Sequence, residues 1–402
     1  MSRKMQRSSS RSRSRPRGKE ASMAQQKQSH IARSELDSSC PRRPSAHPHF
    51  RWKKGMILAR GRYELRSRLG DGTFGRVLAA KDLQTGDFVA IKVGKAGDDF
   101  CEQAVEEAEM LQYIQRLDTH RKRLCVRLLD SFLEPPQHFC MVFEQLGISL
   151  RDFLKRNNGC GLFLEDLRSI AHQLLQGLAG LHAAGVIHTD LKCRNVMLRD
   201  AAVRVAPHPR EPGKEALRPM DCSISIIDFG SAIKKDEAFR GRAGTRQFRS
   251  PEVALGLLWD EKSDIWSAGC IIAMLYTGTR PFSVHDNQEH LAMMERFLED
   301  RFPQHMLRTA RQKWADQDEA SSDLGDVEGF AVTDENRLDW PGEAQPEAVR
   351  RVEDLRPLSA KVLPRHGAFL SLLQGLLQLD PQCRMDAATG CNASFFLSEV
   401  ME

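Results

Sequence analysis

The alternation of apolar and polar residues predicts a strand-rich region where the folded part of the chain begins. Four short runs rich in β-branched and aromatic residues are expected to form strands: Tyr63–Leu69, Arg76–Ala80, Phe88–Val93 and Phe139–Phe143. Four apolar residues between the last two runs recur at helical spacing: Ala104, Ala108, Leu111 and Ile114. The expected order is therefore strand, glycine-rich turn, two strands, helix and further strands.

The pattern changes to that of helices after Gly147. Six apolar residues mark one face of a long buried helix: Leu164, Leu167, Ile170, Leu174, Leu178 and Leu181. We therefore expect a small sheet-rich lobe over about 60–146 and a larger helical lobe over about 147–397. The sequence predicts an α+β fold built from these two lobes.

Two segments of the helical lobe are expected to be insertions. Residues 201–221 are rich in Pro, Arg and Lys, and they separate two strand-like runs, Val196–Leu198 and Ser223–Ile227. We expect this segment to be exposed. A second insertion is expected at about 313–347, within a folded domain that spans 51–402.

Charge is distributed unevenly along the chain. Residues 1–60 carry a net charge of +13, whereas the whole chain carries +5, so the remainder carries −8. Residues 1–50 include an Arg/Ser-rich run and almost nothing that could enter a core, which predicts a disordered basic tail. The tail is either a solvated segment or a nuclear address and a partner-binding or self-phosphorylated arm. A transit peptide is disfavoured because residues 6–22 offer no apolar face.

Composition excludes several other classes. The apolar content of 41% is enough for a sizeable core. No apolar run approaches the ~20 residues that span a bilayer, so no membrane partner is expected. The ten cysteines include no Cys-x-x-Cys pair, which disfavours a disulfide framework or a zinc site.

A glycine-rich turn after the first predicted strand can approach phosphate groups closely. Residues 69–77 read Leu-Gly-Asp-Gly-Thr-Phe-Gly-Arg-Val, which matches the pattern Gly-x-Gly-x-x-Gly-x-Val. A strand follows this turn instead of a helix, which disfavours a dinucleotide-binding fold. The residues expected to bind nucleotide here are Leu69, Gly70, Gly72, Thr73, Phe74, Gly75 and Val77.

Lys92 lies in an otherwise apolar run, Val89–Val93, so its charge needs a partner. Glu107 is the expected partner. It lies three residues after Ala104 and four before Leu111, so it shares the buried face of the predicted helix. A Lys92–Glu107 pair would place the ammonium group on the α- and β-phosphates of a nucleotide bound at the glycine-rich turn.

The stretch 188–195, which reads His-Thr-Asp-Leu-Lys-Cys-Arg-Asn, carries three groups that phosphoryl transfer can use. Asp190 can accept the proton of an attacking hydroxyl, Lys192 can neutralise phosphate charge, and Asn195 can hold a metal ion. Asp228, which opens Asp-Phe-Gly, supplies a second oxygen ligand, and such ligands suit Mg²⁺. With the glycine-rich turn and the preceding lysine, these residues resemble the protein kinase signature set.

A further motif narrows this resemblance. Residues 291–296 read Leu-Ala-Met-Met-Glu-Arg, the six residues that name the LAMMER, or CDC-like (Clk), kinases of the CMGC group. The motif itself is expected to pack as an amphipathic helix. The resemblance covers about 52–396 and implies a bilobal kinase that uses Mg²⁺ and ATP. Members of this family are described as dual-specificity nuclear kinases that phosphorylate Arg/Ser-rich splicing factors.

The resemblance also assigns the adenine site by position. Phe143 corresponds to the gatekeeper residue, and the Glu144 carbonyl and the Leu146 amide should bind adenine. The other residues that the resemblance places around the nucleotide are Ala90, Leu198 and Ile227.

Other correspondences are structural. Glu252 and Arg384 correspond to a buried ion pair of the helical lobe, and Asp264 should hydrogen-bond the backbone of the catalytic stretch. Thr189 replaces the arginine that reads an activation-loop phosphate in many kinases. The substitution predicts a loop that needs no phosphorylation.

Three further departures bear on substrate choice. Phe248 stands where relatives often have Tyr, and no tyrosine lies between Asp228 and Glu252, which excludes tyrosine autoactivation in this loop. Cys193 and Arg194 replace the usual Pro-Glu. In related kinases that glutamate often contacts an arginine of the substrate, which Arg194 would repel. A preference for basic substrates is therefore expected to be weakened or moved elsewhere.

Three functions are compatible with the sequence. The first is an active Ser/Thr kinase, with tyrosine activity open, that acts as a monomer on Arg/Ser-rich proteins in the nucleus. A cytoplasmic or shuttling location is the alternative. The second is a pseudokinase or scaffold, which is disfavoured because every catalytic position holds the required residue type. The third is weak, nonspecific RNA binding by the tail, which has basic residues but no interleaved aromatic residues.

Overall fold

The computed structural model describes most of the chain after the basic tail: residues 49–72, 75–117, 124–235, 243–283, 286–315 and 329–397. Several sequence predictions lie outside these residues. They are the disorder of the tail, the nucleotide contacts of Thr73 and Phe74, and the middle of the second insertion, residues 316–328.

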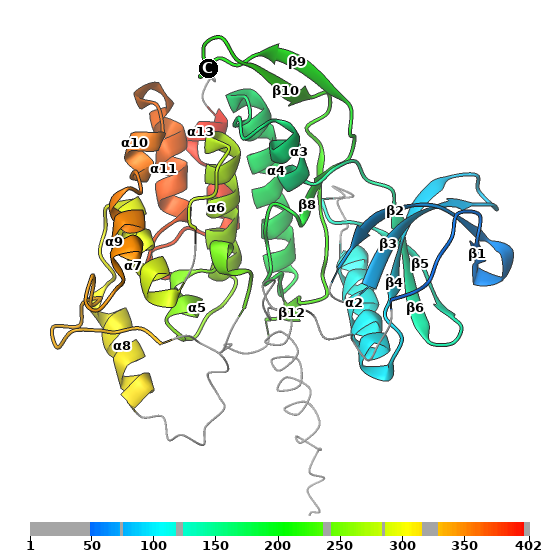
Figure 1. Ribbon diagram of the computed structural model, residues 1–402, viewed down its shortest axis with the longest axis horizontal. Helices are drawn as coiled ribbons and strands as arrows, with labels where there is room; N and C mark the ends of the chain where they lie inside the picture. Colours follow the sequence, from blue (N-terminus) through cyan, green and yellow to red (C-terminus); the bar gives the residue numbers. More distant parts are fainter. Residues whose placement is uncertain are drawn as a thin grey trace, which may run out of the picture.

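The smaller lobe is an antiparallel sheet with one long helix (Figure 1). The sheet has six strands in the order β1-β2-β3-β4-β6-β5. Their bounds are Ile57–Leu58, Tyr63–Asp71, Gly75–Asp82, Phe88–Gly94, Leu128–Glu134 for β5 and His138–Glu144 for β6. Helix α2, Asp98–Leu117, packs against β4, β5 and β6. The predicted strands and helix are all present.

The period of two along β4 explains how this sheet positions chemistry. Val89, Ile91 and Val93 are buried in a small core on one face of the sheet. Ala90 and Lys92 alternate with them and therefore point to the opposite face, toward α2 and the larger lobe. The Lys92 ammonium group therefore lies on the side of the sheet that faces α2 and the larger lobe.

The larger lobe surrounds two central helices, α4 at Leu164–Ala183 and α6 at Lys262–Thr277, which lie side by side in Figure 1. All six apolar residues of the predicted helix face are buried in α4. The other helices are α3 Leu150–Arg156, α5 Pro251–Ala254, α7 Asn287–Leu298, α8 Gln304–Ala315, α9 Pro346–Glu353, α10 Leu358–Lys361, α11 Gly367–Leu376, α12 Ala387–Cys391 and α13 Ser394–Leu397. None of the helices in the described ranges has the length and apolar character needed to cross a membrane.

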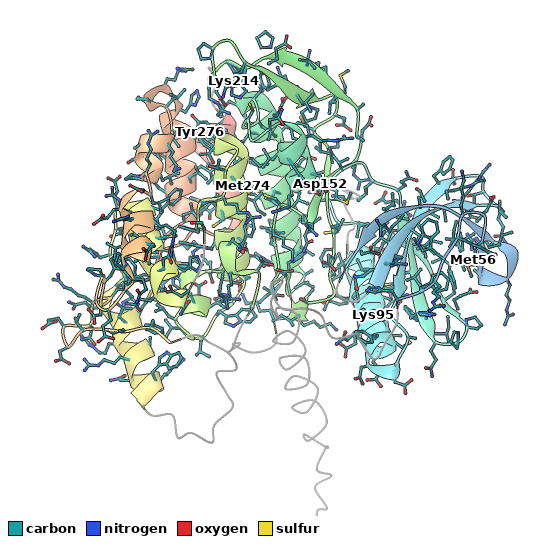
Figure 2. All side chains as sticks on the ribbon, in the orientation of Figure 1. Met56, Lys95, Asp152, Lys214, Met274 and Tyr276 are labelled. Atoms are coloured by element: carbon teal, nitrogen blue, oxygen red, sulfur yellow. The ribbon has the colours of Figure 1, made fainter. Side chains whose placement is uncertain are left out.

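Three pairs of short strands complete the larger lobe. Their bounds are β7 Val186–Ile187 with β12 Ile233–Lys234, β8 Val196–Leu198 with β11 Ile224–Ile226, and β9 Val203–Pro207 with β10 Glu215–Pro219. The last pair forms a hairpin within the predicted insertion at 201–221, with Lys214 in its turn (Figure 2). This hairpin is not exposed throughout, because Ala216 is buried against Cys160 and Phe163.

The LAMMER motif lies in α7 and serves packing, as predicted. Leu291 and Met294 are fully buried, and Arg296 is exposed. Glu289 is also fully buried, where its carboxylate accepts two hydrogen bonds from Arg351. Burial, together with the charges of nearby arginines, lowers the pKa of His290 in this helix to about 3.

Stability should therefore fall as the pH drops below the ordinary histidine pKa. The unfolded chain binds a proton at His290 near pH 6.5, whereas the folded chain does not until about pH 3. Between pH 7 and pH 5 this difference should remove about 2 kcal/mol of unfolding free energy. Urea unfolding of His290→Asn and the parent protein at both values tests the prediction. An equal pH dependence in the two proteins would contradict it.

Candidate active site

The catalytic stretch 188–195 connects β7 to β8, and hydrogen bonds to Asp264 of α6 hold its first residues. The Asp264 carboxylate accepts hydrogen bonds from the backbone N–H groups of His188 at 2.8 Å and Thr189 at 2.9 Å. His182 approaches the same carboxylate at 3.1 Å. These bonds hold Thr189 at a left-handed φ of 69°, which is costly for a β-branched residue. The predicted role of Asp264 is confirmed.

Asp190 is held between two partners. Its Oδ2 lies 2.5 Å from the Lys192 Nζ, and its Oδ1 accepts hydrogen bonds from the Thr245 N–H at 3.0 Å and the Thr245 Oγ1 at 2.8 Å. The Lys192 Nζ also donates to the Thr245 Oγ1 at 3.1 Å. The carboxylate is therefore fixed in orientation next to a cation, and it remains partly exposed to a substrate.

Pairing of two short strands brings the predicted metal ligands together. Asn195 immediately precedes β8 and Asp228 lies just beyond the end of β11, and Val196 pairs with Ile226. The Asn195 carbonyl accepts a hydrogen bond from the Ile227 N–H at 2.9 Å. The Asn195 Nδ2 donates to the Asp190 carbonyl at 2.9 Å, which leaves its amide oxygen for a ligand. An amide oxygen and a carboxylate form a hard donor set that fits Mg²⁺.

Lys92 lies at the centre of the charged groups between the lobes. Its Nζ is 2.8 and 2.7 Å from the two Glu107 carboxylate oxygens and 3.3 Å from the Asp228 Oδ1. Burial lowers the pKa of Lys92, but the charges of both carboxylates outweigh it and hold that pKa above its ordinary value. Desolvation raises the pKa of Asp228, and the charges of Lys92 and Lys192 more than reverse this. The site therefore holds a protonated lysine and an ionised carboxylate at Asp228, the predicted metal ligand.

The described ends of the predicted nucleotide loop lie at the end of β2 and the start of β3. The Gly72 N–H donates to the Gly75 carbonyl at 2.8 Å. A Cβ at Gly75 would lie 2.3 Å from the Val93 carbonyl oxygen, so this position requires glycine. Val77 pairs with Lys92 in the sheet, and Gly70 with Val77. Leu69 lies in the same strand as Gly70 and is half exposed.

The residues assigned to adenine lie along β4, β6 and the segment after it. Ala90 and Phe143 are directly paired in the sheet. Glu144 ends β6, and Leu146 follows in the connection to α3, partly exposed. Ile227 lies immediately before Asp228 and is partly exposed. These positions are compatible with the predicted contacts.

The prediction for Leu198 is wrong. Leu198 and Val196 are both fully buried in the core of the larger lobe, so Leu198 has no surface with which to contact a nucleotide. Met197 lies between them in β8, points to the opposite face and is partly exposed. Alternation along a short strand could have identified Met197, whereas nothing in the sequence places Thr245 beside Asp190.

The predicted ion pair of the larger lobe is present and completely buried. The Arg384 guanidinium donates to the Glu252 carboxylate at 2.7 and 2.8 Å, with side-chain exposures of 0% and 1%. Arg384 also donates to the carbonyls of Lys262 and Gln378. The ion pair joins α5, which contains Glu252, to the segment between α11 and α12, which contains Arg384.

Comparison with known proteins identifies the family. The sequence model of the protein kinase domain family matches residues 63–396 of this chain. Serine/threonine-protein kinase AFC3 of Arabidopsis thaliana is 37% identical, over 84% of this chain and 82% of its own. Dual specificity protein kinase CLK1 of Homo sapiens is 33% identical, over 87% and 68%. The chain belongs to the LAMMER family of protein kinases.

A solved structure supports the same assignment. The crystal structure of the PF14_0431 kinase domain superposes on this kinase with a TM-score of 0.78 and 33% identity, covering 87% of this chain and 98% of the other. The bilobal α+β fold predicted from the sequence is confirmed. As a protein kinase, the enzyme uses ATP and a divalent metal ion.

The Lys92–Glu107 pair gives a prediction for nucleotide use. Glu107→Gln keeps the side-chain shape but removes the charge that positions the lysine. Loss of this charge-assisted contact should lower kcat/KM for ATP about 10- to 100-fold. Glu109→Gln, an exposed change on the same helix, is the matched control and should leave kcat/KM unchanged. Equal steady-state values for both variants would contradict the assigned role.

Proposed function

We propose that this kinase transfers the γ-phosphoryl group of Mg²⁺-bound ATP to serine and threonine hydroxyls of protein substrates. The observation that carries the proposal is the convergence of Asp190, Lys192 and Thr245 beside the two oxygen ligands Asn195 and Asp228. These groups supply the proton acceptor, the positive charge and the metal ligands that the reaction needs.

The arrangement supports a direct in-line transfer. Asp190 accepts the proton of the substrate hydroxyl as that oxygen bonds to the γ-phosphorus, and the bond to the β-phosphate oxygen breaks to release ADP. Lys192 stabilises the charge on the transferred group, and Lys92 holds the remaining phosphates. Bound Mg²⁺ would neutralise phosphate charge, held by Asn195 and Asp228.

The site supports an enzyme that is active without loop phosphorylation. The Lys92–Glu107 pair is already formed. The Thr189 Oγ1 donates to the Ser231 carbonyl at 2.9 Å, so its side chain fixes the start of the loop without a phosphate. The complete set of catalytic residues also argues against the pseudokinase alternative.

The substrate class and cellular location stay predictions. Arg/Ser-rich protein substrates, a nuclear location and a monomeric state are expected from the family resemblance, and weak RNA binding from the basic tail. Activity on tyrosine is likewise a prediction that rests on the family resemblance.

Removal of metal should abolish activity. With excess EDTA, transfer to a serine peptide should fall to background, because two oxygen ligands alone leave the phosphates without a neutralising charge. Excess Mg²⁺ should restore the rate. Phosphopeptide formation, followed by mass spectrometry, measures this. Transfer that persists in EDTA would contradict the metal assignment.

A further inference from the structure

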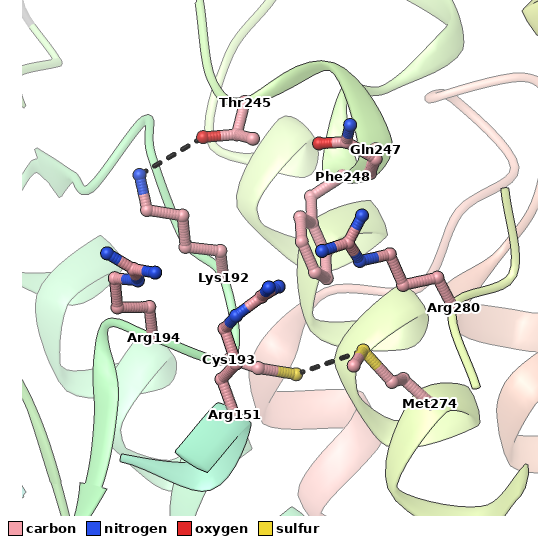
Figure 3. A pocket seen from close by; sticks show the side chains of 9 residues that line it. All are labelled: Arg151, Lys192, Cys193, Arg194, Thr245, Gln247, Phe248, Met274 and Arg280. Atoms are coloured by element: carbon pink, nitrogen blue, oxygen red, sulfur yellow. Dashed lines mark hydrogen bonds between the residues drawn. The ribbon is translucent and has the colours of Figure 1, made fainter. Parts of the chain in front are cut away.

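A cavity of about 290 Å³ lies beside the catalytic residues (Figure 3). The catalytic stretch, the segment 245–248, α3 and the C-terminal end of α6 with the turn that follows contribute its walls. Lys192 and Thr245, which contact Asp190, form one side of it. Met274 and Phe248 supply its apolar surface.

The other lining groups give this cavity a strong positive charge. Arg151, Arg194 and Arg280 line it together with Lys192, and among the residues that the structure describes no carboxylate does. Lys192 is paired with Asp190, but within the described residues none of the three arginines has an ion-pair partner. Figure 3 shows Arg151 and Arg280 approaching the space from different elements.

Two contacts join the walls of this cavity. The Arg151 N–H donates to the Cys193 carbonyl at 3.1 Å, which joins α3 to the catalytic stretch. The Cys193 Sγ lies 3.5 Å from the Met274 Sδ, and burial raises the pKa of this thiol to about 12. The Cys193 thiol therefore stays protonated at neutral pH, and the contacts of this residue join α3 and α6 to the catalytic stretch.

Like charges that line one cavity repel one another unless an anion lies between them. Desolvation and the neighbouring charge of Arg151 lower the pKa of Arg280 from its ordinary value. A carboxylate or a phosphate placed among the three guanidinium groups would remove this repulsion and gain charge-assisted hydrogen bonds.

We propose that this cavity binds an anionic side chain of the protein substrate, a phosphoserine or an acidic residue, a few residues from the acceptor hydroxyl. The proposal rests on the proposed function, since it takes Asp190 as the position of the acceptor. The cavity is continuous with Asp190 through Lys192 and Thr245, and extended chain advances about 3.3 Å per residue, so a neighbouring substrate residue reaches it.

An anion site changes which Arg/Ser-rich substrates this kinase is expected to prefer. An unmodified arginine at this subsite would meet three positive charges and be repelled. A run whose neighbouring serine already carries a phosphate would instead present a matching anion. The sequence argument from Arg194 is thereby extended to Arg151 and Arg280, which the fold brings beside it.

Peptides that differ at one position test the proposal. Arg, Ala, Asp or phosphoserine is placed in turn at each position flanking a single acceptor serine. Dissociation constants from fluorescence anisotropy and kcat/KM for transfer are measured with the full chain. At one or two positions, phosphoserine and Asp should improve both values over Ala by about tenfold or more, with Arg weakest. A gain with phosphoserine alone identifies phosphate as the ligand, and a similar gain with Asp identifies a general anion site.

Four arginine variants make the test specific. Arg280→Gln and Arg194→Gln should each remove most of the gain, whereas Arg156→Gln, an exposed change at the end of α3, should retain it. The double variant Arg194→Glu/Arg280→Glu should prefer Arg at the same position. Retained selectivity in all variants, or equal dissociation constants for the Ala, Asp and phosphoserine peptides, would overturn the proposal. Selective binding without transfer to any peptide would refute the proposed function and leave the anion site standing.

Discussion

Asp190→Asn should lower kcat for transfer to a serine peptide by about 10²- to 10⁴-fold. An amide can still accept the two hydrogen bonds from Thr245, so the backbone of the loop should keep its position. The amide cannot accept the proton of the attacking hydroxyl, and it no longer pairs with Lys192. Steady-state kinetics, with ATP affinity measured separately, should show a loss in turnover and not in nucleotide binding.

The matched control for this change is Asp87→Asn. Asp87 is exposed in the turn between β3 and β4, remote from the catalytic stretch. Its substitution should leave kcat unchanged. If Asp190→Asn retained the turnover of Asp87→Asn, Asp190 would not be the proton acceptor.

Arg384→Met should lower the free energy of unfolding by about 3–5 kcal/mol. The change leaves the Glu252 carboxylate charged in a site with no exposed surface, together with two carbonyls that lose their donor. A urea titration at neutral pH measures the loss. The double variant Glu252→Leu/Arg384→Met should recover part of it, because no buried charge then remains unpaired.

Arg311→Met provides the control for the buried pair. The Arg311–Asp334 pair has side-chain exposures of 45% and 89%, and exposed pairs of this kind contribute less than about 1 kcal/mol. Similar losses in Arg311→Met and Arg384→Met would show that burial does not govern the energetics of these pairs.

Local periodicity was sufficient to predict the elements that position the site. The position of Lys92 in the otherwise apolar run Val89–Val93 indicated that its charge needs a partner, and helical spacing placed Glu107 on the buried face of α2. Their contact then follows from one helix packing on one sheet. The hydrogen bonds of Asp264 to the catalytic stretch were predictable only by family resemblance, since they join residues 75 and 76 positions apart.

Features that depend on long-range packing were not predictable. Thr245 contacts Asp190 across 55 positions in a segment without periodicity. Nothing in the sequence indicates that Arg151 and Arg280 line one cavity with Arg194, because this depends on how α3 and the end of α6 pack. The error at Leu198 has a different cause, because a strand of three residues is too short for its buried face to be assigned from pattern alone.

The central claim is that this chain is an active phosphotransferase and not a nucleotide-binding scaffold. The most direct test mixes the full chain with Mg²⁺, ATP labelled in its γ-phosphate and a serine-containing peptide, then follows the label by mass spectrometry. We predict that the label moves to the peptide serine with the parent protein and stays on ATP with Asp190→Asn. Thermal stabilisation of the parent protein by Mg²⁺ and ATP, with no label transferred to any peptide or to the protein itself, would contradict the claim.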